Sequence, residues 1–197
     1  MVRDQIVLSA TRTFARDGAL GSRLEDIRRD ANVSVGAIYH HFADKEALYA
    51  AAWTQALGSY QTVFLEALRA SSDAEGGVRT AVERQIRWVV THRDAAIMLY
   101  SGRPSGEDAE ELLAVQNRVF FTEVMRWWRL HASYGSLRDL EPALLHALWL
   151  GAADSYCRQW VGSGENDVPR ELARALADAA WDTLKGDGSK IRSGRLR

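Results

Sequence analysis

The distribution of proline restricts this chain to a largely helical fold. Only three prolines occur in 197 residues, Pro104, Pro142 and Pro169, and each lies between segments in which apolar residues recur at helical spacing. Proline is tolerated in loops and in the first helical turn, but it disrupts helix interiors. No Val-, Ile- and Tyr-rich stretch alternates with period two over the length of a strand. The sequence therefore predicts an all-α protein.

Composition excludes several classes of protein. The chain is 47% hydrophobic and 26% charged, which is typical of a folded chain rather than a disordered one. Its single cysteine, Cys157, excludes an internal disulfide framework and a cysteine-based zinc site. No apolar run approaches the roughly 18 residues of a membrane span, and the N-terminus lacks the pattern of a signal peptide. We therefore expect a cytoplasmic protein with no membrane association.

Apolar spacing and break signals predict the helices. They are expected over residues 2–17, 24–31, 35–42, 45–70, 78–92, around 97–100, 107–134, 142–161 and 170–185, with a loop over 71–77. Gly18 and Gly21 should end the first helix. Ser22 and Glu25 have the spacing of a capping box for the second helix, and Asn32 can end that helix as a left-handed residue.

Residues 24–42 have the outline of a helix-turn-helix, with two short helices joined by a three-residue turn. The side chains spaced to face the interior are Ile27, Ala31, Ile38 and Phe42. Ser34 can cap the second helix and can also reach a phosphate. Tyr39 and His40 point away from the interior, and both can donate hydrogen bonds to phosphate oxygens. This pattern favours binding to DNA.

Residues 33–48 read VSVGAIYHHFADKEAL. This segment resembles the signature of the tetracycline-repressor (TetR) family of bacterial regulators, V-S-x-G-x-hydrophobic-Y-x-x-F-x-x-K-E-x-L. Upstream, Ile6, Ala10, Phe14, Gly18 and Ile27 also fall where that family has apolar residues or glycine. The resemblance covers about residues 5–50. It implies a homodimeric repressor whose N-terminal domain binds a double-stranded operator, and whose C-terminal domain binds a small-molecule inducer and the partner subunit.

The resemblance also implies which residues lie at the DNA. They are Arg23, Ser34, Val35, Gly36, Ala37, Tyr39, His40 and Lys45. Arg23 and Ser34 would contact phosphates, and Lys45 would contact the DNA backbone. Val35 and Ala37 stand where the family often has a polar side chain, so they would make apolar contacts, for example with a thymine methyl group. Arg28 replaces a usual small residue and is either an extra phosphate contact or a solvated charge.

Net charge does not by itself support DNA binding. Residues 1–50 contain seven Lys and Arg residues and seven Asp and Glu residues, and the whole chain has a formal net charge of −1. Specific binders usually present a basic face, so the positive groups would have to be segregated on one side. The alternative is a helical protein-interaction module that does not bind DNA. Neither a catalytic triad order nor a phosphate-binding glycine loop supports an enzyme, and we expect no catalytic residues and no cofactor.

A ligand site is expected in the C-terminal part of the chain. Its candidate residues are Trp88, His92, Tyr100, Phe121, Met125, Trp128, Trp149, Asp154 and Tyr156. Aromatic residues at helical spacing are most often core, but a cavity between helices needs such walls and a few polar groups. Asp154 is the only charged residue in 142–157, so it needs a partner, either a cation such as Arg158 or a ligand. The expected ligand is an unknown small molecule that is partly apolar or aromatic. The histidines lack a metal-ligand spacing, so no metal is expected.

The apolar segment 142–157 also predicts a subunit interface, because a helix that is apolar nearly all round must be covered on more than one side. We expect a homodimer formed through residues 142–161 and 170–185. The predicted domains are a helix-turn-helix DNA-binding domain (1–47), a helical ligand-binding and dimerisation domain (48–186) and a basic flexible tail (187–197).

Overall fold

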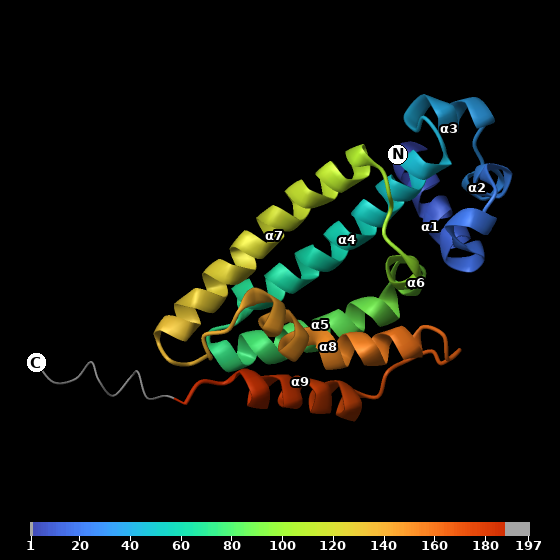
Figure 1. Ribbon diagram of the computed structural model, residues 1–197. Helices are drawn as coiled ribbons and strands as arrows, with labels where there is room; N and C mark the ends of the chain where they lie inside the picture. The colour runs from blue at the N-terminus through green and yellow to red at the C-terminus, as the bar shows by residue number, and fades with distance from the viewer. Residues whose placement is uncertain (1, 188–197) are drawn as a thin grey trace, which may run out of the picture. The chain divides into compact units, whose positions relative to one another are not determined.

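The structure is a computed structural model that describes residues 2–187, apart from the side chain of residue 108 (Figure 1). The described chain forms nine helices: α1 (Val2–Gly21), α2 (Leu24–Ala31), α3 (Val35–His41), α4 (Lys45–Ala70), α5 (Ala74–Thr91), α6 (Arg93–Ser101), α7 (Glu107–Ser133), α8 (Pro142–Trp160) and α9 (Arg170–Leu184). Its only β-type pairing is one isolated bridge between Leu137 and Lys185. The predicted all-α fold is confirmed. None of the described helices is long and apolar enough to cross a membrane.

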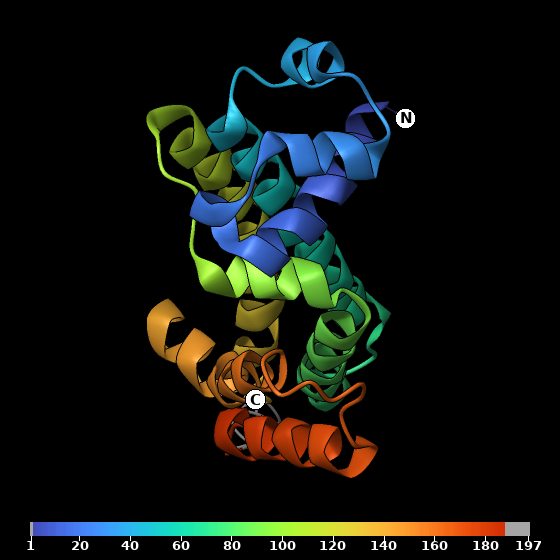
Figure 2. The ribbon, with the colours of Figure 1, turned by 90° about the vertical axis from the view of Figure 1, so that its right-hand side faces the viewer.

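The chain divides into two compact units. The first contains the residues up to Ser59 together with His92–Asn117, and the second contains Tyr60–Thr91 and the residues from Arg118 onward. The predicted domain boundary after residue 47 falls inside the first unit, because α6 returns to pack along α1 (Figure 2). Most of the predicted basic tail, residues 188–197, lies outside the described residues.

The core of the first unit follows the predicted apolar spacing. Ile6, Ala10 and Phe14 are buried along one face of α1. They pack with the four interior residues expected in the helix-turn-helix, Ile27, Ala31, Ile38 and Phe42. The Phe14 ring also meets Tyr49 of α4 edge to face, with 5.0 Å between ring centroids. This shared core fixes α2 and α3 against α1 and α4.

The connection from α1 to α2 differs from the prediction. Gly18 kinks α1 with φ 73° and ψ 165°, and helical structure continues to Gly21. The predicted capping box is wrong, because the buried Ser22 hydroxyl donates to the Ala19 carbonyl at 3.0 Å. Arg23 is the residue at the N-cap of α2, and its side chain makes no capping bond. Asn32 does adopt the predicted left-handed conformation, with φ 50°.

In the second unit, α5, α8 and α9 pack against one another. Trp149 of α8 lies at the centre of an aromatic cluster and donates from its indole Nε1 to the Val78 carbonyl at 3.1 Å. Its ring contacts Phe64, Trp127 and Trp128 at centroid distances of 5.2, 5.8 and 5.5 Å. Most of the tryptophans in this unit therefore form the packed core.

The start of α5 was predicted too late. The helix begins at Ala74 rather than near Val78, so the expected loop 71–77 is too long. The Asp73 carboxylate accepts a hydrogen bond from the Gly76 amide at 2.7 Å and so caps the first turn. An aspartate at this position satisfies one of the free N–H groups at a helix start, and it lets the glycine pair that follows be helical.

Gly77 is required by packing. A Cβ atom at this position would lie 2.2 Å from Cζ2 of the Trp127 ring, far inside contact distance. We expect Gly77→Ala to lower the free energy of unfolding by about 1–3 kcal/mol through overpacking, measured by urea denaturation. Gly21→Ala is the matched control, because the nearest atom to its new Cβ would be Asp17 Cβ at 3.9 Å. Equal stability of the two variants would contradict the described packing.

Candidate nucleic-acid interface

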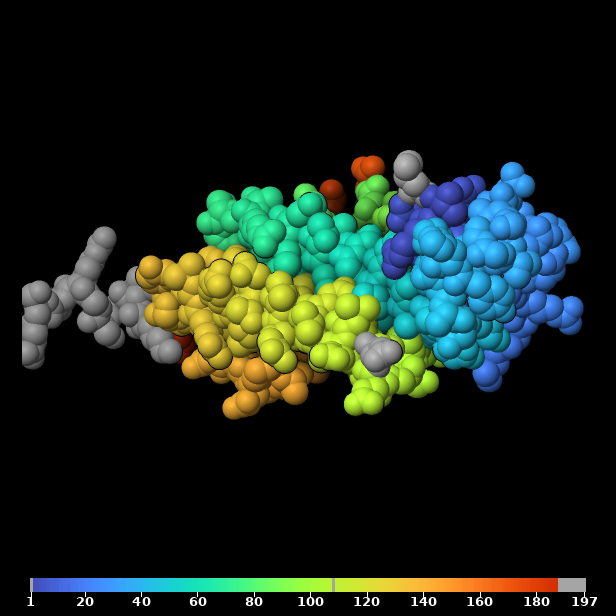
Figure 3. Space-filling model, turned by 90° about the horizontal axis from the view of Figure 1, so that it is seen from above, coloured from blue at the N-terminus to red at the C-terminus, as the bar shows by residue number. Residues whose placement is uncertain are grey.

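The α3 helix is a short segment with one anchored face and one exposed face. Ile38 is 2% exposed, whereas Val35 and Tyr39 are 50% and 54% exposed. Gly36 and His40 are also exposed, and Ala37 is half-buried. The helix forms part of the surface of the first unit (Figure 3). The predicted DNA-facing residues of α3 therefore lie together on the solvent side, with Ala37 only partly accessible.

Ser34 sets the start of α3. Its backbone is extended, and its Oγ accepts a hydrogen bond from the Ala37 amide at 3.1 Å, as predicted. The hydroxyl proton is not used in this bond, because the oxygen acts as the acceptor. Ser34 is exposed, so the same hydroxyl can hold the helix start and donate to an anion such as a phosphate.

Lys45 connects the start of α4 to the end of α1. Its Nζ donates to the carbonyl oxygens of Leu20 and Ser22, each at 3.3 Å. An ammonium group has three donors, so one remains for a phosphate oxygen. Asp44 caps the same helix by accepting from the Ala47 amide at 2.7 Å. The contacts of Lys45 with α1 were not visible in the sequence, because they depend on the kink at Gly18.

Carboxylates neutralise several of the arginines in this unit. Arg12 pairs with Asp30 at 2.6 Å, and Arg28 pairs with Glu25 at 2.7 Å. The hydrogen bond from Arg28 lowers the pKa of the Glu25 carboxyl. Arg28 also donates to the Val33 carbonyl at 3.3 Å, so it is a structural link rather than a solvated charge.

Arg23 differs from these arginines. It is exposed, and the described part of the chain provides it with no ion-pair partner. Its position immediately before α2 is that of an N-cap, where the unsatisfied N–H groups of a helix start also favour anions. Together with Lys45, Arg23 supplies positive charge that no described carboxylate of the first unit neutralises.

A cation–π contact is a feature that the sequence analysis missed. The guanidinium carbon of Arg3 lies 5.4 Å from the centre of the Phe42 ring, at the end of α3. Such contacts stabilise modestly at exposed sites. Arg3 thereby links the first turn of α1 to Phe42, the residue that ends α3.

The predicted ligand residues are divided between the two units. His92 and Tyr100 belong to the first unit, and the other seven belong to the second. Trp88, Trp128 and Trp149 are buried in the core. Phe121 and Met125 instead line an open hollow on α7. The sequence could not separate these cases, because core and cavity walls use the same aromatic residues at the same spacing.

Asp154, one of the predicted ligand residues, belongs to a polar cluster in the second unit. The Gln85 amide donates to Oδ1 of Asp154, and His146 Nε2 lies 3.9 Å from Oδ2. Burial raises the pKa of Asp154, against the charges of His146 and Arg158. Among the described residues, the buried Oε1 of Gln85 and Nε1 of Trp128 have no hydrogen-bond partner. Buried polar atoms of this kind are uncommon and mark a place where a polar ligand group could be satisfied.

The raised pKa of Asp154 predicts a pH dependence of stability. A carboxyl with a higher pKa in the folded state than in the unfolded state binds its proton more tightly when folded. Its ionisation therefore costs stability above the folded pKa, and the cost disappears as the pH falls to the unfolded value. We expect Asp154→Asn to raise the melting temperature at pH 7 and to have no such effect at pH 3.5. A lower melting temperature of the variant at pH 7 would contradict this.

No group of three or more His, Cys, Asp and Glu residues in the described chain could hold a metal ion. Cys157 is fully buried, and burial raises the pKa of its thiol to about 12. The thiol therefore stays protonated at neutral pH and acts as a small apolar side chain.

Comparison with known proteins finds sequences similar to this chain among bacterial regulators. A sequence model described as "Bacterial regulatory proteins, tetR family" matches residues 6–52. The chain is 23% identical over 188 residues to the HTH-type transcriptional repressor KstR2 of Rhodococcus jostii, covering 93% of this chain and 78% of that protein. It is also 23% identical over 184 residues to the uncharacterized HTH-type transcriptional regulator YerO of Bacillus subtilis, covering 92% of this chain but only 64% of that protein.

The fold has counterparts among solved structures. The transcriptional regulator FadR from Bacillus subtilis, solved in complex with stearoyl-CoA, superimposes with a TM-score of 0.73 at 17% identity, covering 91% of this chain and 95% of that one. The family model spans most of α1, all of α2 and α3, and the first turns of α4, so it includes the exposed face of α3. Residues 6–52 of the chain thus match the tetR family of bacterial regulatory proteins.

Proposed function

We propose that the protein is a homodimeric transcriptional repressor that binds operator DNA through α3 and leaves the DNA when a small molecule binds its second unit. The observation that carries this proposal is the geometry of α3. Ile38 anchors the helix, while Val35, Tyr39 and His40 face solvent. A module that only packed against other helices would have no need to expose these side chains together with the Ser34 hydroxyl.

The proposed repressor would dimerise through α8 and α9. The N-terminal part of α8 exposes apolar side chains beside His146, with Leu144 47% exposed and Ala143, Ala147 and Ala152 also at the surface. A second copy would cover this face. Twofold symmetry would then present two copies of α3 to successive major grooves, roughly 34–36 Å apart.

The ligand would act by shifting the population of dimers. It can favour release only by as much as its affinities for the DNA-bound and free arrangements differ. The polar cluster of Gln85, His146 and Asp154, in which the buried Oε1 of Gln85 has no hydrogen-bond partner, is the part of the second unit that best suits such a ligand. That FadR was solved with stearoyl-CoA is consistent with a ligand-responsive fold. DNA binding would reside in residues 1–47, with ligand binding and dimerisation in 48–186, in a protein that acts in the cytoplasm and is not an enzyme.

The test is selection of duplexes from a random pool by the full-length protein, followed by footprinting and measurement of the particle mass. The expected result is an inverted repeat with half-sites separated by about 10 bp, protected by two copies or a multiple of two. A strictly monomeric particle, or a pool that yields no enriched sequence, would contradict the proposal.

The alternative, a helical interaction module without DNA binding, has one observation in its favour. Ion pairs within the first unit occupy Arg12, Arg16, Arg28 and Arg29, which reduces its available positive charge. Binding of this kind would show little dependence on salt, whereas neutralisation of phosphates gives an affinity that falls steeply with salt. The salt dependence therefore separates the two functions.

A further inference from the structure

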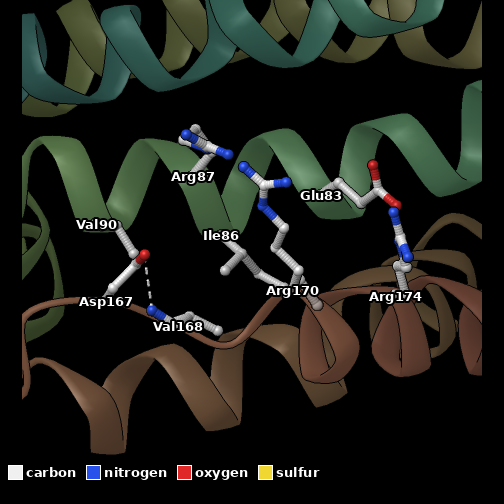
Figure 4. Close-up of a pocket in the computed structure, with 9 residues that line it drawn as sticks. Glu83, Ile86, Arg87, Val90, Asp167, Val168, Arg170 and Arg174 are labelled. Atoms are coloured by element: carbon white, nitrogen blue, oxygen red, sulfur yellow. Dashed lines mark hydrogen bonds between the residues drawn. The ribbon is translucent and has the colours of Figure 1, made fainter.

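A cleft in the second unit brings three arginines together. It lies between α5 and the segment that leads into α9, and its charged lining residues are Glu83, Arg87, Asp167, Arg170 and Arg174 (Figure 4). It encloses about 280 Å³, close to the lower limit of roughly 300 Å³ for small-molecule sites. Within the described part of the chain, no ion pair joins any of these arginines to an acidic residue.

The two helices place two arginines, Arg87 of α5 and Arg170 of α9, opposite each other in the cleft. Glu83 and Arg87 are one turn apart on α5, and Arg170 and Arg174 are one turn apart on α9. Arg174 extends toward Glu83, which is a complementary arrangement, whereas Arg170 extends toward Arg87 (Figure 4). Two guanidinium groups that share a cleft repel each other unless an anion lies between them. This pair of arginines therefore lacks a negative partner.

The acidic residues of the cleft do not supply that partner. The Asp167 carboxylate accepts a hydrogen bond from the Val168 amide at 2.8 Å, so it is turned toward its own backbone. Glu83 lies one helical turn away from Arg87, on the side of Arg174 (Figure 4). No described carboxylate in the lining therefore pairs with Arg87 or Arg170, and both arginines are exposed to an anion from solvent.

Two further features suit a phosphate group. The planar guanidinium fork matches the oxygens of a phosphate and binds them with paired hydrogen bonds. In addition, α9 begins at Arg170 without a side-chain cap, so the positive end of its dipole lies beside the arginines. Ile86 and Val168 are buried in the lining and provide an apolar wall for a small organic group.

We propose that this cleft binds a small phosphate-bearing molecule, with the phosphate between Arg87 and Arg170 and with Arg174 at the edge of the site. The proposal goes beyond the regulatory function above, because the cleft does not include Asp154, Gln85 or any residue of α3. The cleft would give the second unit a second ligand-binding site, for phosphate or a phosphate ester.

The test is isothermal titration of the full-length protein at constant ionic strength with inorganic phosphate, glycerol 3-phosphate and AMP. The wild type is expected to bind at least one of the three. Tighter binding of inorganic phosphate would indicate free phosphate as the ligand, and tighter binding of glycerol 3-phosphate or AMP would indicate a phosphate ester. Arg87→Gln and Arg170→Gln should each weaken this binding by at least about tenfold, since each loses a charge-assisted hydrogen bond. Arg84→Gln is the matched control, because Arg84 is on α5 but outside the cleft, 4.0 Å from Glu66.

A charge reversal keeps the test independent of folding. Arg87→Glu should form an ion pair with Arg170, raise the melting temperature without phosphate, and abolish the response to phosphate. The proposal is overturned if none of the three probes binds the wild type, or if the Arg87→Gln and Arg170→Gln variants bind as well as Arg84→Gln. It is also overturned if these variants change only the oligomeric state, because the arginines would then belong to a subunit contact. Affinity for selected duplexes should be unchanged in all of them, so failure here leaves the DNA-binding proposal intact.

Discussion

Tyr39→Ala is expected to weaken binding to a selected operator duplex by at least about tenfold while leaving the free energy of unfolding unchanged. The Tyr39 side chain is 54% exposed on α3 and is absent from the buried cluster of the first unit. A hydrogen bond to a charged phosphate contributes about 1.5–3 kcal/mol, and a loss of 1.4 kcal/mol is a tenfold change in affinity. Fluorescence anisotropy with the labelled duplex measures this change.

A second tyrosine provides the control for this substitution. Tyr134 is 61% exposed, close to the value for Tyr39, but it lies directly after α7 in the second unit. Tyr134→Ala removes the same chemical group from a surface that is not predicted to meet DNA, and its affinity should match that of the wild type. If Tyr39→Ala and Tyr134→Ala bind the duplex equally well, α3 is not the DNA-reading element.

Phe14→Ala is expected to have the largest effect on stability, a loss of about 3–5 kcal/mol in the free energy of unfolding. Phe14 is 1% exposed and packs in the cluster that holds α2 and α3 against α1. Removal of the ring leaves a cavity and also deletes the edge-to-face contact with Tyr49. Urea denaturation measures the loss, and duplex binding should fall with it because α3 loses its support.

Phe121→Ala is the matched control for the core substitution. Phe121 is 50% exposed on α7, and its nearest aromatic neighbour is Phe120 at 5.4 Å between centroids. Surface substitutions of this kind usually change stability by no more than about 0.5 kcal/mol. A Phe14→Ala variant as stable as Phe121→Ala would show that the first unit does not have the described core.

The helix-turn-helix was predictable because its signals are local. Four apolar residues at helical spacing, Ile27, Ala31, Ile38 and Phe42, specify which faces are buried, and all four are buried. Proline at residue 142 and the breaks around the other helices placed most boundaries within a few residues. The start of α5 was missed because a capping aspartate before two glycines resembles a loop in sequence.

The arrangement of charges and of the second unit could not be predicted in the same way. The pairing of Arg28 with Glu25 is a local i,i+3 contact within α2, but the bond from Arg28 to the Val33 carbonyl depends on the turn that follows the helix. The bond between Gln85 and Asp154 joins residues 69 positions apart. A bond of this length along the chain leaves no periodic signal, because long-range packing decides it. The nine candidate ligand residues were dispersed for the same reason.

The most direct test of the central claim is the salt dependence of binding to the selected duplex. In the proposed complex, Arg23 and Lys45 would supply two cationic contacts in each protomer, hence four in a dimer. Because the slope is about −0.9 for each neutralised phosphate, the logarithm of the association constant should fall with the logarithm of salt concentration with a slope of about −3 to −4. In the Arg23→Gln variant, this slope should fall to about half its wild-type value. A binding constant independent of salt, or a slope unchanged by removal of Arg23, would contradict a recognition helix flanked by these two residues at the DNA.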